Sequence, residues 1–375
     1  MPVIKSVYRL CRYRNERKKF VREFSIRKKQ DTELASRYES ETGKLIVFIV
    51  PGSDWATGKD KISGGTMSIV SICEESAQMK NIHGAATIMC TLNRDHLLLR
   101  HKMFDNNTPV FRFNQLEKYF DNCHEVLFHL PEFLVKEFYP SLTSGDKRWL
   151  DRMDMVHINI MNQNIQLMPA PSIINSLLDF SDKITVTTAH QKYCSVNFRK
   201  QYNVPIHKLS VWISPEQYVF RSWEEKENLL VVSPDKHPRK EEVLQELQKM
   251  EGLKVQIIQN LTYQQYKELV SRAKWSLTFG EGLDGYLIEP VFSGAVGFAV
   301  YNEDFFTPDF ADLKTVYPSM DALKQRILYD IRSLDNKDEF TAYQQNQFEL
   351  CAKYYSKEQY RKNIALFYSG QYTIQ

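Results

Sequence analysis

The chain has 375 residues, of which 43% are hydrophobic, 13% aromatic and 25% charged, and its formal net charge at pH 7 is +3. This length accommodates two α/β domains of ordinary size, and this composition excludes a disordered protein. No run of about 18 apolar residues occurs, and the charged N-terminus lacks the apolar stretch of a secretory signal, so we expect no transmembrane helix and no secretion.

The six cysteines are scattered along the chain, and none of them belongs to a C-x-x-C pair. This pattern argues against structural zinc and against a disulfide framework, and it is typical of a reducing compartment. We therefore expect a cytoplasmic protein that binds no metal.

The first 29 residues are strongly basic, with eleven lysines and arginines against only Glu16 and Glu23. Apolar residues such as Phe20 and Phe24 are interleaved at helical spacing. This segment, taken as residues 1–40, suits an anionic membrane surface or a solvated helix with one face on the core. Both interpretations are favoured over binding of nucleic acid.

The next part of the chain alternates predicted strands with predicted helices. Lys44 to Val50 (KLIVFIV) is an apolar run typical of a buried parallel strand. A polar loop then leads to Gly64 and Gly65, followed by an amphipathic helix from about Met67 to Met79. This alternation predicts a doubly wound α/β layer. Further strand-like runs lie at Ala86–Cys90, Val126–His129, Met155–Ile160 and Ile184–Thr188.

A second series of the same kind begins after Pro215. No apolar run continues through Ser214–Glu227, so we place the domain boundary there and expect two domains at 41–215 and 216–344. The tail from Thr341 to Tyr368 is predicted to be helical. The strands expected in the second domain are Leu229–Val232, Lys254–Ile258, Ser276–Phe279 and Val296–Tyr301, and the helices are Lys240–Met250, Tyr263–Arg272 and Gly285–Phe292.

The most informative segment runs from Gly280 to Glu289 (GEGLDGYLIE), between a predicted strand and a predicted helix. Glycines let a backbone approach a ligand closely, and the start of a helix offers free N–H groups to an anion. Carboxylates in the same turn suit hydroxyl groups, so the combination fits a nucleotide-sugar. The spacing of Glu281 and Glu289 resembles the E-x7-E signature of retaining glycosyltransferases of the GT-B fold, often called family 4.

The resemblance covers most of residues 44–368 and implies the fold. That fold has two doubly wound Rossmann-like domains facing across a cleft, with C-terminal helices that cross back to the first domain. In this interpretation, residues 41–215 together with 345–375 form the acceptor domain, and residues 216–344 bind the nucleotide-sugar. Gly64 and Gly65 resemble the glycine turn of the family's first βα unit, which faces the donor.

The resemblance also assigns a role to the charged segment from Ser233 to Lys240 (SPDKHPRK). In the family, an arginine and a lysine placed after this strand neutralise the departing diphosphate. Arg239 and Lys240 are the nearest matches, and Lys236 is a third candidate. Here Ser-Pro replaces the Gly-Arg step common in the family, and an ordinary solvated helix start is the alternative interpretation.

The glutamates and one histidine receive roles by the same resemblance. Glu281 would bind the hydroxyls of the donor sugar, and Glu289 the hydroxyl pair of the nucleotide ribose. His129, at the end of a first-domain strand, would face the sugar across the cleft, although a structural histidine is the alternative. Weaker candidates are His157 and His190. The remaining donor contacts expected in the turn are Gly282, Leu283, Asp284 and Gly285.

The predicted function is transfer of a sugar from a nucleoside-diphosphate sugar to a saccharide acceptor, with retention of configuration. The chain contains no Asp-x-Asp pair, so we expect no metal and no other cofactor. The expected acceptor is a lipid-linked saccharide of surface polysaccharide synthesis, reached at the inner face of the membrane through residues 1–29; no nucleic-acid partner is expected. The alternatives are a nucleotide-sugar epimerase of the same architecture and a non-catalytic carbohydrate-binding relative.

Overall fold

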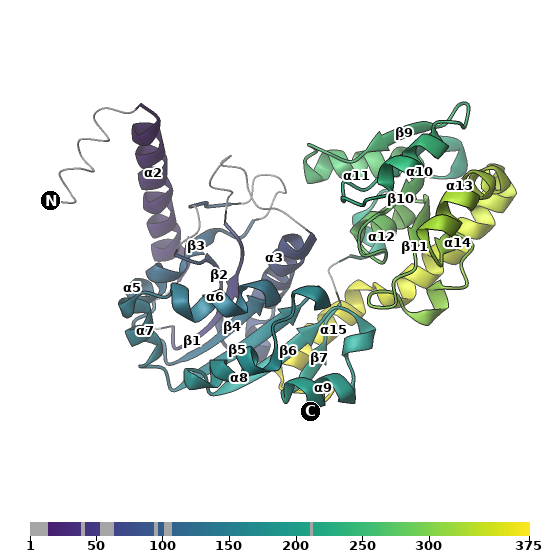
Figure 1. Ribbon diagram of the computed structural model, residues 1–375. Coiled ribbons are helices and arrows are strands. Elements are labelled where there is room, and N and C mark those ends of the chain that lie inside the picture. The colour runs from purple at the N-terminus through teal and green to yellow at the C-terminus, as the bar shows by residue number, and fades with distance from the viewer. Residues whose placement is uncertain (1–13, 39–41, 53–63, 94–96, 101–106, 211–212) are drawn as a thin grey trace. The chain divides into compact units, whose positions relative to one another are not determined.

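The computed structural model describes residues 14–38, 42–52, 64–93, 97–100, 107–210 and 213–375. The first 13 residues of the basic segment and the loop before Gly64 lie outside these ranges. The chain divides into two compact units, Met1–Val186 (unit 1) and Thr187–Gln375 (unit 2) (Figure 1). The domain limits inferred from the sequence, with a boundary after residue 215, stay a prediction.

The first sheet has seven strands in the order β3-β2-β1-β4-β5-β6-β7. Its recorded pairings are parallel, with Val47 of β1 opposite Ile88 of β2 and Phe128 of β4. β1 is buried at every position after Lys44, which explains why its sequence is apolar throughout rather than alternating. The strands are β1 (Lys44–Ile49), β2 (Ala86–Thr91), β3 (Val110–Arg112), β4 (Glu125–Pro131), β5 (Met155–Asn162), β6 (Lys183–Thr188) and β7 (Ile206–Lys208).

The helices of unit 1 are mostly short. α3 begins at Gly64, three residues before the start expected from the sequence, and buries nine of its residues. The long helix α2 instead buries only Gln30 and Leu34. The α-helices are α2 (Arg14–Arg37), α3 (Gly64–Ala77), α4 (Lys80–His83), α5 (Leu116–Tyr119), α6 (Val135–Phe138), α7 (Ser144–Leu150) and α8 (Pro171–Asn175). Short 3-10 helices lie at Phe113–Gln115, Glu132–Leu134, Tyr139–Ser141, Ile165–Leu167 and Ser176–Asp179.

The second sheet, within unit 2, has five strands in the order β12-β11-β10-β8-β9. Successive residues of β8 pack on opposite faces: Leu230 joins a core with α10 and α13, while Leu229 joins a core with α11. Both faces are therefore covered, as expected for a doubly wound sheet. The strands are β8 (Glu227–Val232), β9 (Lys254–Ile257), β10 (Ala273–Leu277), β11 (Val296–Val300) and β12 (Val316–Tyr317).

The helices of unit 2 follow the predicted periodicity closely, and most begin at a side-chain cap. Thr262 caps α11, Asp284 caps α12 and Ser319 caps α13. The α-helices are α9 (Val196–Tyr202), α10 (Lys240–Leu247), α11 (Tyr263–Arg272), α12 (Gly285–Phe292), α13 (Met320–Leu334), α14 (Lys337–Tyr354) and α15 (Lys357–Tyr368). Short 3-10 helices lie at Gln191–Tyr193, Pro215–Gln217, Trp223–Glu225 and Pro308–Phe310.

The C-terminal tail returns to the seven-stranded sheet. Ile374 forms an antiparallel bridge with Ile206 of the edge strand β7, through N–H···O contacts of 2.8 and 2.9 Å. His207 Nε2 also lies 2.8 Å from the carbonyl oxygen of Asn363 in α15. The prediction that the last helices cross back is therefore confirmed. Among the described helices, none combines the length and the apolarity that a membrane span requires.

Candidate functional site

The candidate site lies where β8 and β10 end side by side. The two strands pair in parallel, with Val232 opposite Leu277, so their carboxyl ends meet at one edge of the sheet. Ser233 fastens the two following turns together. Its N–H donates to the carbonyl of Leu277 at 2.9 Å, and its hydroxyl accepts from the N–H of Phe279 at 2.9 Å. Ligands of such folds bind at this edge.

Two carboxylates meet at the first glycine of the 280–285 segment, which we call the glycine turn. A Cβ atom at Gly280 would lie 2.7 Å from Asp284 Oδ2 and 2.9 Å from Asp235 Oδ2. No side chain therefore fits at this position without moving a carboxylate. Asp235 comes from the turn after β8 and was not among the residues predicted from the sequence.

Gly282 is required for two reasons. Its φ is +92°, a conformation that L side chains rarely adopt. A Cβ atom there would also overlap the ring of Phe306 and lie 2.9 Å from the carbonyl oxygen of Val300. The next residue, Leu283, is only 6% exposed and packs in a hydrophobic cluster with Leu287. Leu283 thus anchors the turn to the core. Because its side chain is buried, only its backbone could make the predicted contact with the donor.

Asp284 is the N-cap of α12. Its Oδ1 accepts from the N–H of Leu287 at 3.2 Å, and its Oδ2 accepts from the Thr278 hydroxyl at 2.8 Å. Burial raises the pKa of Asp284 to about 7; the nearby Asp235 and Glu281 carboxylates raise it further, whereas the Thr278 hydrogen bond lowers it. The carboxyl that we expected near the sugar is therefore engaged in starting the helix, and it titrates close to neutral pH.

Glu289 lies one helical turn beyond Gly285, among tyrosines. A Cβ atom at Gly285 would lie 2.8 Å from Glu289 Oε1, so the carboxyl rests against the turn's backbone. Burial raises the pKa of Glu289 to about 8, although hydrogen bonding to Tyr266 and Tyr218 lowers it. Its Oε2 is buried and has no hydrogen-bond partner among the residues that the structure describes. Glu289 thus offers an unsatisfied oxygen beside the helix start.

A cluster of tyrosines packs beside Glu289. The hydroxyls of Tyr218 and Tyr263 are 3.0 Å apart, and the rings of Tyr263 and Tyr266 stack with centroids 6.0 Å apart. Tyr266 also meets Tyr286 edge-on at 5.9 Å. Part of this cluster is visible in the sequence, because Tyr263 and Tyr266 are spaced by one helical turn at the start of a predicted helix. Nothing in the sequence connects Tyr218 with them.

The side chains of Lys240 and Arg239, two of the three predicted cations, point in different directions. Lys240 Nζ donates to the carbonyl oxygens of Ser233 and Asp235, the latter at 3.0 Å. It also lies 5.4 Å from the ring centroid of Phe279, the last residue before the glycine turn. Burial lowers the pKa of Lys240. Its ammonium group is therefore at the junction of the β8 and β10 turns, where the resemblance places a diphosphate contact.

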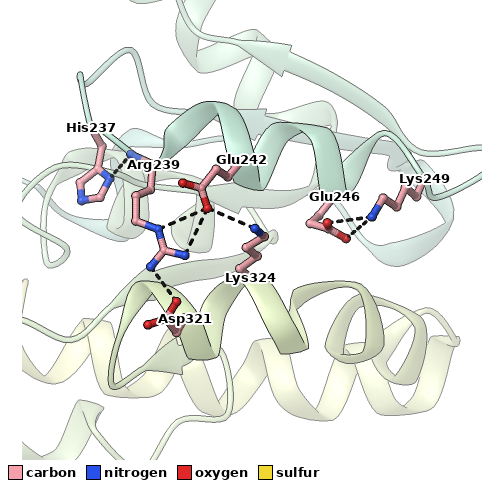
Figure 2. A network of polar contacts seen from close by, with 7 residues as sticks. All are labelled: His237, Arg239, Glu242, Glu246, Lys249, Asp321 and Lys324. Carbon is pink, nitrogen blue, oxygen red and sulfur yellow. Dashed lines mark hydrogen bonds and ion pairs between the residues drawn. The ribbon is translucent and has the colours of Figure 1, made fainter.

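Arg239, in contrast, belongs to an ion-pair network between α10 and α13 (Figure 2). Its Nη1 lies 2.7 Å from Asp321 Oδ1, and its Nη2 lies 3.2 Å from Glu242 Oε2. Lys324 shares that oxygen of Glu242 at 3.1 Å. The network forms because Arg239 occupies the N-cap position of α10, from which its side chain reaches α13. Lys236, the third predicted cation, is exposed in the same loop.

Three of the predicted site residues, Gly64, Gly65 and His129, belong to unit 1. Gly64 and Gly65 open α3, and a Cβ atom at Gly64 would meet nothing within 4 Å. His129 is only 1% exposed; its ring stacks on Phe48 with centroids 4.3 Å apart, and its Nδ1 lies 3.0 Å from Asn159 Nδ2. Burial holds the pKa of His129 well below its ordinary value. The ring is thus neutral and enclosed, and a role in contacting sugar stays a prediction.

The two weaker histidine candidates are also packed. His157 Nε2 lies 2.9 Å from the Thr185 hydroxyl, and burial lowers the pKa of His157 to about 3. His190 is buried in unit 2 and meets the ring of Phe305 edge-on at 4.9 Å. Among the described residues, no group of three or more His, Cys, Asp or Glu side chains is arranged to hold a metal ion.

No family model matches the sequence, and no curated protein matches it. Solved structures do resemble it. An alpha-glucosyltransferase in complex with UDP is 11% identical, with 85% of this chain and 99% of that chain covered and a TM-score of 0.52. HepE of Anabaena in complex with UDP is 9% identical, with 87% and 100% covered and a TM-score of 0.53. Sucrose-phosphate synthase from Thermosynechococcus elongatus is 11% identical, with 87% and 98% covered and a TM-score of 0.55.

These similarities show the fold. The chain has the GT-B architecture of two Rossmann-like domains that the sequence predicted, and it spans nearly the whole length of each of these structures. At 9% to 11% identity they do not assign the chemistry, which must be argued from the site.

The crowding around Gly282 predicts that a side chain at this position destabilises the fold. Gly282→Ala should destabilise unit 2 by more than Gly252→Ala, because both glycines have positive φ but a Cβ atom at Gly252 meets nothing within 4 Å. The control should cost about 1 kcal/mol for backbone conformation alone, and the overlap with Phe306 adds to that cost in the test variant. Urea unfolding of both variants measures the difference. Equal losses would mean that the turn relaxes around a side chain.

Proposed function

We propose that this chain is a retaining glycosyltransferase, of the family 4 kind, that transfers a sugar from a nucleoside-diphosphate sugar to a saccharide acceptor. The observation that carries the proposal is the glycine turn: Glu281 lies in it, Glu289 lies one helical turn beyond it in α12, and the ammonium group of Lys240 lies over Phe279, the residue just before it. The fold supports it, because the alpha-glucosyltransferase and HepE of the same architecture were solved in complex with UDP.

The donor-binding chemistry follows from the charges at the turn. The N–H of Leu287 is already bonded to Asp284, so the diphosphate would contact Lys240 and the N–H groups of Gly285 and Tyr286 at the start of α12. Asp235, Glu281 and Asp284 repel a phosphate placed among them, so the hydroxyl-bearing sugar is the part of the donor that suits the carboxylates. Glu281 would accept from the sugar hydroxyls, and the unsatisfied Oε2 of Glu289 would accept from the ribose hydroxyls.

The transfer step breaks the bond between the anomeric carbon and the phosphate oxygen and forms a bond from the same carbon to an acceptor oxygen on the same face. The acceptor's proton passes to the departing phosphate. Lys240 stabilises the charge that develops on that phosphate, with Arg239 and Lys236 as further predicted contributors. No metal and no cofactor is part of this proposal. The contribution of unit 1, through Gly64, Gly65 and His129, likewise stays a prediction.

For the acceptor, we propose a lipid-linked saccharide used in surface polysaccharide synthesis, reached at the cytoplasmic face of the membrane. A sugar on a lipid carrier is confined to the bilayer surface, so the enzyme must work at that surface. The strongly basic N-terminal segment suits such a place.

A transfer assay tests the function. The full-length protein should release nucleoside diphosphate from one member of a panel of nucleotide-sugars, faster with a saccharide acceptor than without. Glu281→Ala should abolish this release while the melting temperature stays unchanged, because the variant removes sugar contacts from a partly exposed side chain. Glu349→Ala, an exposed glutamate on α14, is the control. Turnover of the Glu281 variant within about threefold of the control would contradict the proposed role.

The separation of the two cations predicts unequal effects. Lys240→Met should lower kcat by about two to three decades, corresponding to about 2–4 kcal/mol, and should change the donor KM less. Arg239→Met should have a smaller effect, because its guanidinium is already paired. Asp321→Asn breaks one of those ion pairs without removing the cation, and so measures how much the network itself contributes to kcat. A wild-type kcat in Lys240→Met would mean that the diphosphate binds elsewhere.

The raised pKa of Glu289 predicts that nucleotide binding depends on pH. With a pKa of about 8, its carboxyl is mostly protonated at pH 7 and ionised at pH 9. Ribose hydroxyls donate to the ionised form, so UDP should bind about tenfold more tightly at pH 9 than at pH 7. The terminal phosphate of UDP itself loses its last proton at about pH 6 to 7, and this contribution is the same for wild type and Glu289→Gln. Calorimetry on wild type and Glu289→Gln checks this; the same pH dependence in both proteins would exclude Glu289 as its source.

A further inference from the structure

Helix α2 has an anchored half and a free half. In the anchored half, Gln30 Nε2 donates to the carbonyl oxygens of Leu98 at 3.0 Å and Val110 at 2.8 Å, and Leu34 is 1% exposed. Before Gln30, α2 buries no side chain. Figure 1 shows the N-terminal part of α2 standing out from the sheet of unit 1. The helix is thus fixed at one end and presents its other end to the surroundings.

The free half carries three bulky apolar side chains in the open. Phe20 is 53% exposed, Val21 64% and Phe24 61%. At 3.6 residues per turn, Val21 and Phe24 are rotated by about 140° and 80° from Leu34, whereas Phe20 is rotated by only about 40°. All three stay exposed because the described packing of α2 on unit 1 begins only at Gln30. An exposed cluster of this kind usually marks a binding surface.

Cations surround these apolar side chains. Arg17, Phe20, Val21, Phe24 and Lys28 follow the spacing i, i+3, i+4, i+7 and i+11, which places them on one face of the helix. Residues 14–29 contain eight lysines and arginines against two glutamates. Long basic side chains can lay their methylene stems along an apolar surface while their charges reach outward. The face therefore combines an apolar centre with cationic ends.

We propose that the free half of α2, residues 14–29, is a docking surface for an anionic lipid bilayer. Phosphate headgroups would contact the lysines and arginines, while Phe20, Val21 and Phe24 would enter the boundary between headgroups and acyl chains. A nucleic acid would use the charges but leave the phenylalanines exposed. A second copy of the chain would bring two strongly cationic segments together. The bilayer alone satisfies both features of the face.

This inference rests on α2 and does not require that the proposed sugar transfer is right. Vesicle binding is measured without donor or acceptor, so loss of binding and loss of catalysis are separate results. Full-length protein should float with vesicles of phosphatidylcholine containing about one-third phosphatidylglycerol at low salt, and should stay behind with phosphatidylcholine alone. Raising the salt should weaken binding through screening of the charges.

Two variants separate the parts of the face. Arg14→Gln/Arg17→Gln/Lys28→Gln removes the cations on the side of the apolar face and should weaken binding to anionic vesicles on the order of 100-fold, since each basic residue near such a surface contributes several-fold. Lys136→Gln/Lys200→Gln/Lys362→Gln removes the same charge from exposed positions elsewhere and should bind like wild type. Phe20→Gln/Val21→Gln/Phe24→Gln keeps the charge and should bind about tenfold more weakly.

Three outcomes would overturn the proposal. The first is vesicle binding by the apolar variant equal to wild type, together with equally tight binding of an oligonucleotide, which would assign the face to nucleic acid. The second is a wild-type dimer that the apolar variant turns into a monomer, which would assign it to a second copy. The third is equal loss in the α2 charge variant and the control charge variant, which would mean nonspecific attraction. Circular dichroism confirms that each variant is folded.

Discussion

The parallel pairing of β8 with β10 is the constraint on which the candidate site depends. It brings the turn after Val232 against the turn after Leu277, and Ser233 locks them together. Asp235 and Asp284 thereby face the same glycine, Gly280, from two turns. Placing carboxylates this close costs free energy, because like charges repel and burial disfavours ionisation. The fold offsets part of that cost by using Asp284 to cap α12 and by bonding it to Thr278.

The same crowding tunes the site for its proposed ligand. Asp284 and Glu289, with pKa values raised to about 7 and about 8, both hold protons near neutral pH. Such perturbed groups in one place are typical of functional sites rather than of ordinary surface turns. Lys240 provides the positive charge at the junction, and its own pKa is lowered by burial. Hydroxyl donors would satisfy the buried oxygens of Asp235 and Glu289 that have no hydrogen-bond partner among the described residues, and Lys240 would attract a diphosphate, which is why we propose a nucleotide-sugar rather than either part alone.

Much of this could be predicted from the sequence, because the information is local. Apolar runs gave the strands, and glycines around Glu281 gave the turn. What sequence could not supply was the direction of side chains. Arg239 and Lys240 are neighbours in the chain, yet Arg239 occupies an N-cap position and reaches α13 while Lys240 turns back to Ser233. Tyr218 meets Tyr263 across 45 residues of chain, and no periodicity connects them. His129 was expected at the end of a strand, but it lies inside β4, where it packs against Phe48.

Hydrogen exchange of the backbone amides, with and without UDP, shows whether the nucleotide binds at the glycine turn. If the glycine turn binds the nucleotide, saturating UDP should slow exchange in two segments, residues 233–240 and 278–289, because ligand contacts and ordering of the turns protect their N–H groups. The effect should be much smaller in Glu289→Ala, while the rest of unit 2 exchanges as in wild type. Slowed exchange confined to other parts of the chain, with both turns unchanged, would contradict the account and place the nucleotide elsewhere.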